Sequence, residues 1–158
     1  MWRAELRRNR NTSGVPTAVA ARELLASRED VWRFLAEPFH LSDWWPGVRG
    51  VQPDRRGLAP GARWELTASP QGRGLFGTVL GSPRTTRTLV VMEVRENEFL
   101  HVLFAEDGVE AELVLEPAGE SRTQATLTVE GSWFRLNHSV PRTALNRLHA
   151  LCQTAAEL

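Results

Sequence analysis

The sequence contains no Lys, Ile or Tyr, and its 158 residues include only one cysteine, Cys152. A single cysteine cannot form an internal disulfide or a thiolate metal site, so the fold does not need an oxidising compartment. No run of eighteen apolar residues occurs, and the basic N-terminal segment is not followed by an apolar stretch, so we expect neither a membrane span nor a secretory signal peptide. We therefore expect a cytoplasmic protein.

The formal net charge is zero, because nineteen Arg residues balance nineteen acidic residues. A neutral chain has no overall field to attract nucleic acid or an anionic membrane, and we expect neither as a partner. The charge is uneven, since residues 1–92 sum to about +6 and residues 93–158 to about −6 by counting Arg against Asp and Glu. Either complementary surfaces pair two copies in a homodimer, or the two halves face each other within one fold.

The length fits one domain, and 42% hydrophobic residues are enough for a core or an enclosed cavity. Residues 1–14 hold four Arg and a polar end, which predicts a mobile basic extension that is dispensable for folding. The predicted domain covers residues 15–158.

The order of secondary-structure elements is predicted from hydrophobic periodicity and from the positions of capping and helix-ending residues. A strand begins at Thr17, and Ser27-Arg28-Glu29-Asp30 is typical of a helix N-cap. Pro38 ends that helix, and a second short helix is expected over residues 39–45. Six further short runs rich in Val, Leu, Thr and aromatic residues predict strands, over residues 48–51, 62–68, 85–94, 98–104, 109–115 and 123–129.

The connections between these strands are short, which favours antiparallel hairpins. Residues 69–84 form the one long loop, a length that is usually functional or mobile. Alternation of Val109, Ala111, Leu113 and Leu115 with glutamates predicts a sheet with one wet and one dry face. Residues 141–158 carry apolar side chains at helical spacing, so an amphipathic terminal helix should cover the dry face.

This order of elements resembles the helix-grip fold of the START-like (SRPBCC) superfamily, an α+β fold with a curved antiparallel sheet of about seven strands around a long C-terminal helix. Three segments carry the resemblance, namely residues 25–32 (LASREDVW), 42–48 (SDWWPGV) and 60–64 (PGARW). The polyketide cyclase/dehydrase-like branch is the most similar. The resemblance implies binding or conversion of a hydrophobic small molecule in a cavity, without a cofactor, and it transfers no catalytic residue.

Motifs for other chemistry are absent from the sequence. The four histidines show no metal-binding spacing, so no metal is expected. His149 and Cys152 lie on one helical stripe and could act as base and nucleophile, but a small buried thiol beside a structural histidine fits them better. The catalytic residues therefore stay unknown, and enzyme activity stays open.

The candidate ligand cavity is predicted from aromatic residues and the dry face. A Trp offers a large apolar surface and one N–H donor, which suits the wall of a ligand pocket. His101 shares a strand face with Phe99 and Leu103. The predicted cavity residues are Trp44, Trp45, Trp64, His101, Leu113, Leu127, Leu145, Leu148, His149 and Cys152.

Three functions remain open from the sequence. The first is binding of an apolar small molecule, such as a polycyclic compound or a lipid, in a cavity between the sheet and the C-terminal helix. The second resembles polyketide cyclases and aromatases, with His101, Arg63 or a Trp donor assisting proton transfer. The third is a partner-binding module that uses the acidic half and the loop 69–84.

Overall fold

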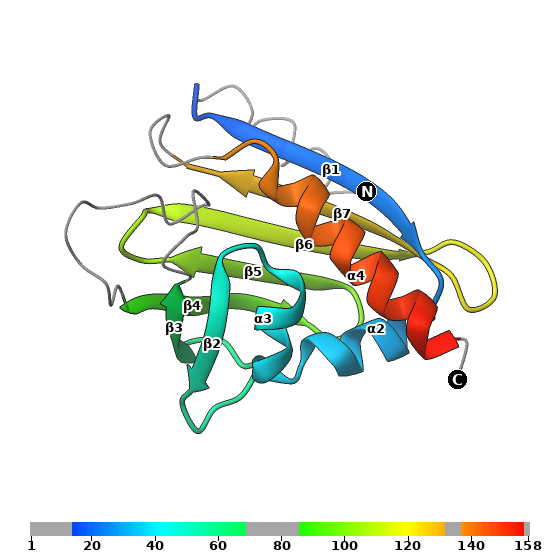
Figure 1. Cartoon of the computed structure of the whole chain (residues 1–158), viewed down its shortest axis with the longest axis horizontal. Helices are drawn as coiled ribbons and strands as arrows, with labels where there is room; N and C mark the ends of the chain where they lie inside the picture. The colour runs from blue at the N-terminus through cyan, green and yellow to red at the C-terminus, as the bar shows by residue number, and fades with distance from the viewer. Residues whose placement is uncertain (1–13, 69–85, 132–136, 157–158) are drawn as a thin grey trace.

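Seven strands form one antiparallel sheet, and three α-helices lie against it in the computed structural model, which describes residues 14–68, 86–131 and 137–156 (Figure 1). The expected basic extension, apart from Gly14, and the long loop 69–84 lie outside these residues. The strands are β1 (Thr17–Leu24), β2 (Val48–Pro53), β3 (Arg63–Ala68), β4 (Thr86–Arg95), β5 (Phe99–Phe104), β6 (Val109–Pro117) and β7 (Thr123–Glu130). The helices are α2 (Arg28–Leu35), the 3-10 turn η1 (Pro38–His40), α3 (Leu41–Trp44) and α4 (Val140–Ala156).

The strand order in the sheet is β1-β7-β6-β5-β4-β3-β2, with every neighbouring pair antiparallel. The chain therefore crosses from one edge strand, β1, to the other, β2, through α2, η1 and α3. It then returns strand by strand across the sheet. This is the predicted helix-grip architecture, and the α+β fold class is confirmed.

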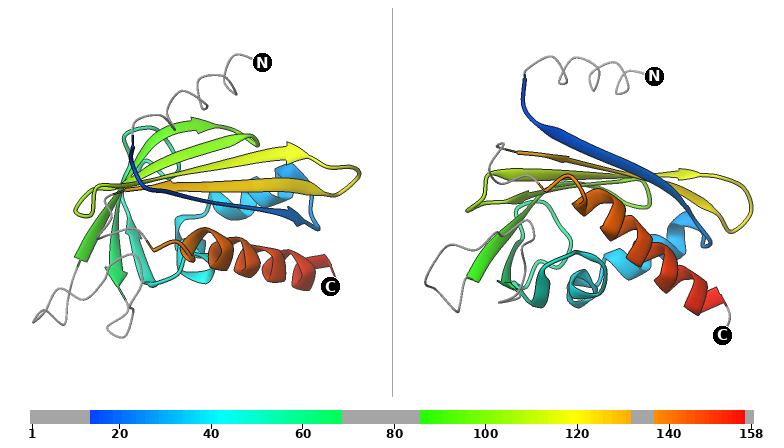
Figure 2. Two further views of the ribbon diagram at one scale, coloured as in Figure 1. Left: turned by 90° about the horizontal axis from the view of Figure 1, so that it is seen from above. Right: turned by 45° about the horizontal axis from the view of Figure 1, so that its top comes forward.

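The helices cover one face of the sheet, here called the inner face, as both views of Figure 2 show. On β6, Val109, Ala111, Leu113 and Leu115 are buried on this face, and the residues between them are partly exposed on the outer face. The same alternation runs along β7. Side chains on opposite faces of a strand alternate with a period of two, so the predicted division into a wet and a dry face is confirmed.

The passage from β1 into α2 depends on two hydroxyl groups. The Ser27 Oγ accepts a hydrogen bond of 3.2 Å from the Asp30 backbone N–H and caps α2, an interaction that typically contributes about 1 kcal/mol. The Thr123 Oγ1, fully buried at the start of β7, donates to the Ala26 carbonyl at 2.7 Å. These bonds fix the direction in which α2 leaves the sheet.

The corner between α3 and β2 places the two adjacent tryptophans. Trp45 follows the last turn of α3, and its backbone N–H donates to the Leu41 carbonyl at 2.9 Å. Gly47 then adopts φ of +86°, a conformation that side chains disfavour, and turns the chain into β2. Both indoles are consequently directed inward and are buried.

Helix α4 lies across β1 and β7 and also contacts α3. Its buried stripe consists of Val140, Ala144, Leu145 and Leu148. Nδ1 of His149 lies 3.0 Å from the Glu23 carbonyl oxygen, which fixes the helix to the edge strand. Among the described residues no helix has the length and apolar character to cross a membrane, whereas the cytoplasmic location stays a prediction.

A candidate ligand cavity

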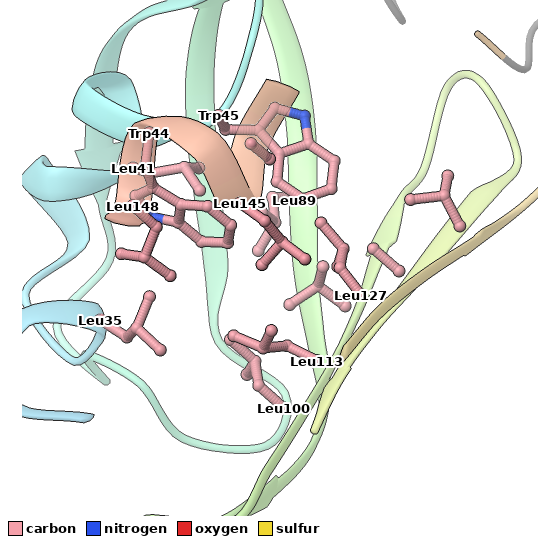
Figure 3. Packing of buried hydrophobic residues seen from close by; sticks show 14 of the residues in the cluster. Leu35, Leu41, Trp44, Trp45, Leu89, Leu100, Leu113, Leu127, Leu145 and Leu148 are labelled. Carbon is pink, nitrogen blue, oxygen red and sulfur yellow. The ribbon is translucent and has the colours of Figure 1, made fainter. Parts of the chain in front are cut away.

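An apolar cavity lies between the inner face of the sheet and the segment α2–α3. Five strands, the two helices and the corner at Trp45 contribute to its wall, so it sits where the crossing segment passes over the middle of the sheet (Figure 3). Twelve residues line it: Leu35, Leu41, Trp44, Trp45, Trp64, Leu89, Leu100, Val102, Phe104, Ala111, Leu113 and Leu127.

The cavity is narrow. The space between its side chains, including the open end, amounts to about 430 Å³, but only about 30 Å³ can hold the centre of a water molecule. One water molecule needs roughly 10–15 Å³ by this measure. A ligand larger than a few atoms therefore enters only if lining side chains move apart, and a polycyclic ligand needs the largest opening.

Trp45 forms the aromatic end of the cavity. Its ring lies 5.1 Å from that of Phe104 with the planes 31° apart, and it meets the Trp44 ring edge-on at 5.4 Å. Edge-on and tilted pairs are favoured geometries for aromatic rings and hold both indoles in defined orientations. This end of the wall is consequently rigid compared with the flexible leucines that complete it.

The indole N–H groups of two lining tryptophans differ in their hydrogen bonding. The Trp64 Nε1–H donates to the Gly57 carbonyl at 3.1 Å, so this group is already satisfied. The Trp45 side chain is 1% exposed, and its Nε1 has no hydrogen-bond partner. Among the side chains that the structure describes in the wall, one buried donor is therefore without an acceptor.

None of the twelve lining side chains is ionisable. A buried ion pair lies elsewhere on the inner face of the sheet. Its Arg87, on β4, lies on this face because it is paired in register with the buried Leu66 of β3. The Arg87 Nε is 3.8 Å from Oδ2 of Asp107 in the β5–β6 turn, and both side chains are at most 10% exposed. Arg87 and Asp107 do not line the cavity, so its described wall is uncharged.

Five of the predicted cavity residues do line it, namely Trp44, Trp45, Trp64, Leu113 and Leu127. Leu145 and Leu148 are each 1% exposed and belong to the same core, but they are not part of the wall. The cavity was predicted between the sheet and the terminal helix, whereas the described open space lies beside α4, under α2 and α3.

His101, another predicted cavity residue, does not line the described cavity. On β5 the cavity is lined by Leu100, Val102 and Phe104, which places His101 on the outer face. There its Nε2 lies 3.0 Å from Oε2 of Glu110. Arg63 is exposed and precedes the inward-facing Trp64, so neither residue reaches a ligand in the cavity.

His149 and Cys152 lie on α4 away from the cavity. Burial and the negative charge of Asp30 raise the pKa of the Cys152 thiol, which lowers the fraction of reactive thiolate. The structural interpretation of this pair is thereby favoured over a nucleophile and base. Across the described part of the chain, no group of three or more His, Cys, Asp or Glu side chains is suited to hold a metal ion.

Seven residues of the wall were not predicted from the sequence: Leu35, Leu41, Leu89, Leu100, Val102, Phe104 and Ala111. Those on strands follow from alternation once the inner face is known. The helical residues Leu35 and Leu41 carried a weaker signal, because a short amphipathic helix shows which side is buried but not what lies beneath it.

The comparisons with known proteins agree with this geometry. The family model described as "Polyketide cyclase / dehydrase and lipid transport" matches residues 16–152. The chain belongs to this family. The match covers all seven strands, α2, α3 and most of α4, and so includes every residue of the cavity wall.

Solved structures with this fold include proteins of several bacteria. Protein NE0264 of Nitrosomonas europaea is 20% identical, with a TM-score of 0.67 over 90% of this chain and 97% of its own. TTHA0849 of Thermus thermophilus is 18% identical, with a TM-score of 0.67 over 89% and 99%. XoxI of Bacillus cereus is 11% identical, with a TM-score of 0.64 over 89% and 97%. At these identities the similarity establishes the fold alone. A search of curated proteins finds no match.

Proposed function

We propose that this protein binds an uncharged, largely apolar small molecule in the cavity between the inner face and α2–α3. The observation that carries the proposal is the composition of the wall, in which twelve apolar or indole side chains converge and none is ionisable. Binding pockets for small molecules are predominantly apolar with a few placed polar groups, as this one is. Membership of a family that includes lipid transport supports the same function.

A cyclase or dehydratase mechanism has less support from the wall. Proton transfer needs an acid or base within hydrogen-bond reach of the reacting group. The described wall offers no His, Asp, Glu, Lys or Cys, and His101 and Arg63 lie on the outer side of the sheet. We therefore propose binding or transport rather than catalysis.

The test fills the cavity without changing the surface. Ala111 is 2% exposed and lines the cavity, so Ala111→Leu places a larger side chain in the open space. Ala125 is equally buried on the neighbouring strand β7 but does not line the cavity, and Ala125→Leu is the matched control. Both substitutions should cost about 1 to 3 kcal/mol of stability through overpacking.

Binding is measured by titration calorimetry with n-propylbenzene, a neutral one-ring hydrocarbon. Native mass spectrometry of protein purified from its own host shows in parallel whether a small molecule is retained. Wild type and Ala125→Leu should bind n-propylbenzene or retain a compound, and folded Ala111→Leu should do neither. Absence of both signals in folded wild-type protein, or equal binding by all three, would contradict the proposal. If Ala111→Leu does not fold, the smaller Ala111→Val replaces it.

A further inference from the structure

The ligand can be specified further from the unpartnered donor in the wall. A buried N–H without an acceptor costs about 1 to 3 kcal/mol, so such groups in proteins are nearly always paired. Nε1 of Trp45 is an exception in this structure, and it belongs to a residue that lines the proposed binding cavity. An acceptor carried by the bound molecule would remove the exception.

Water is a poor candidate for this acceptor. A buried water molecule normally makes about three hydrogen bonds. Among the twelve described lining residues only the three tryptophans carry polar side-chain atoms, and each of these is an N–H that can donate but not accept; that of Trp64 already donates to the Gly57 carbonyl. A water at Trp45 would therefore have too few side-chain partners, whereas a carbonyl or ether oxygen attached to an apolar body needs only one.

The orientation of Trp45 indicates which end of the ligand carries this oxygen. In Figure 3 the six-membered part of the indole points toward Leu127, and the nitrogen lies on the edge remote from Leu100 and Leu113. Leu100 and Leu113, which carry no donor, lie at the opposite end of the described cavity. The polar atom and the apolar body are thus assigned to different ends.

We propose that the ligand is an apolar molecule with a hydrogen-bond acceptor at one end, such as a ketone, ester or ether, which accepts a hydrogen bond from Nε1 of Trp45. The apolar body lies between α2 and the leucines of β5 and β6. A carboxylate fits this role poorly because none of the twelve described lining side chains is cationic and could balance its charge. This inference rests on the proposed binding function and assigns Trp45 as its specificity-determining residue.

The test compares n-propylbenzene with propiophenone, which has the same carbon skeleton but carries a carbonyl in place of one methylene. The measured quantity is the ratio of their dissociation constants, because effects of cavity size cancel in it. Trp45→Phe removes the donor and should lower the relative affinity for the ketone by about three- to tenfold. Trp64→Phe is the matched control, since its N–H is already bonded, and should leave the ratio unchanged.

The outcomes separate the two proposals. If folded wild-type protein binds neither compound, the binding function fails and this inference fails with it. If both bind but Trp45→Phe leaves the ratio at its wild-type value, only the role of Trp45 is overturned.

A second measurement does not depend on the folding of a variant. The indole ¹H–¹⁵N signal of Trp45 in the wild-type protein should move downfield when propiophenone binds and should not do so with n-propylbenzene. Equal responses to the two compounds would overturn the hydrogen bond.

Discussion

Nε2 of His101 lies 3.0 Å from Oε2 of Glu110 on the outer face, with β5 between this pair and the cavity. We predict that His101→Gln leaves the affinity for n-propylbenzene unchanged and lowers the free energy of unfolding by at most about 1.5 kcal/mol. Calorimetry and urea unfolding measure the two quantities. Leu100→Ala, one residue away on the inner face, should weaken binding. A loss of affinity in His101→Gln alone would show that the assignment of faces is wrong.

The buried pair of Arg87 and Asp107 should contribute to the stability of the fold but not to the choice between polar and apolar ligands. Removing one partner of a buried ion pair typically costs about 3 to 5 kcal/mol, because the other charge stays buried. Arg87→Met should therefore destabilise the protein by about that amount in urea unfolding. The double variant Arg87→Met with Asp107→Leu should recover part of the loss. A double variant less stable than Arg87→Met would contradict this prediction.

Gly131 follows β7 and packs against β6. A Cβ atom at this position would lie 2.7 Å from Cγ2 of the fully buried Val109, closer than side chains approach. We expect Gly131→Ala to lower the unfolding free energy by about 1 to 3 kcal/mol. Gly50→Ala, where the nearest atoms are 3.8 Å away, is the control and should cost less. Rescue of Gly131→Ala by Val109→Ala would confirm the steric cause.

Cys152 should react slowly with iodoacetamide. Burial and the charge of Asp30 raise its pKa, so the thiolate forms only at higher pH than in an unfolded chain. The pH at which the alkylation rate reaches half its maximum should be higher in the folded than in the urea-unfolded protein. Asp30→Asn should lower this pH in the folded protein. A half-maximal pH at or below the unfolded value would restore the interpretation of Cys152 as a nucleophile.

The sheet and the terminal helix were predictable because both follow from periodicity. On β6 and β7 apolar residues alternate with Glu, Gln and Thr, so the inner face is evident from the sequence. On β5 both faces carry apolar side chains, since Phe99 and Leu103 lie outside while Leu100 and Val102 lie inside. Alternation of apolar and polar residues is therefore weak on β5, and the sequence pattern alone does not show on which face His101 lies.

The position of the cavity was less predictable. Helical spacing correctly identified Leu145 and Leu148 as buried. Whether a buried side chain borders open space depends on how completely its neighbours fill the gap, which is a matter of three-dimensional packing. The same limit applies to Trp45, whose missing hydrogen-bond partner becomes visible only when every neighbouring acceptor has been placed.

The most direct test of the account is to locate the ligand by NMR. In methyl-labelled protein, intermolecular NOEs from n-propylbenzene should reach Leu35, Leu113 and Leu127, which line the cavity. The methyl groups of Leu103 and Met92, which do not line it, should show none. NOEs to the cavity leucines are the result that we predict. NOEs confined to Leu103 and Met92, or binding without any NOE to the cavity leucines, would contradict the central claim.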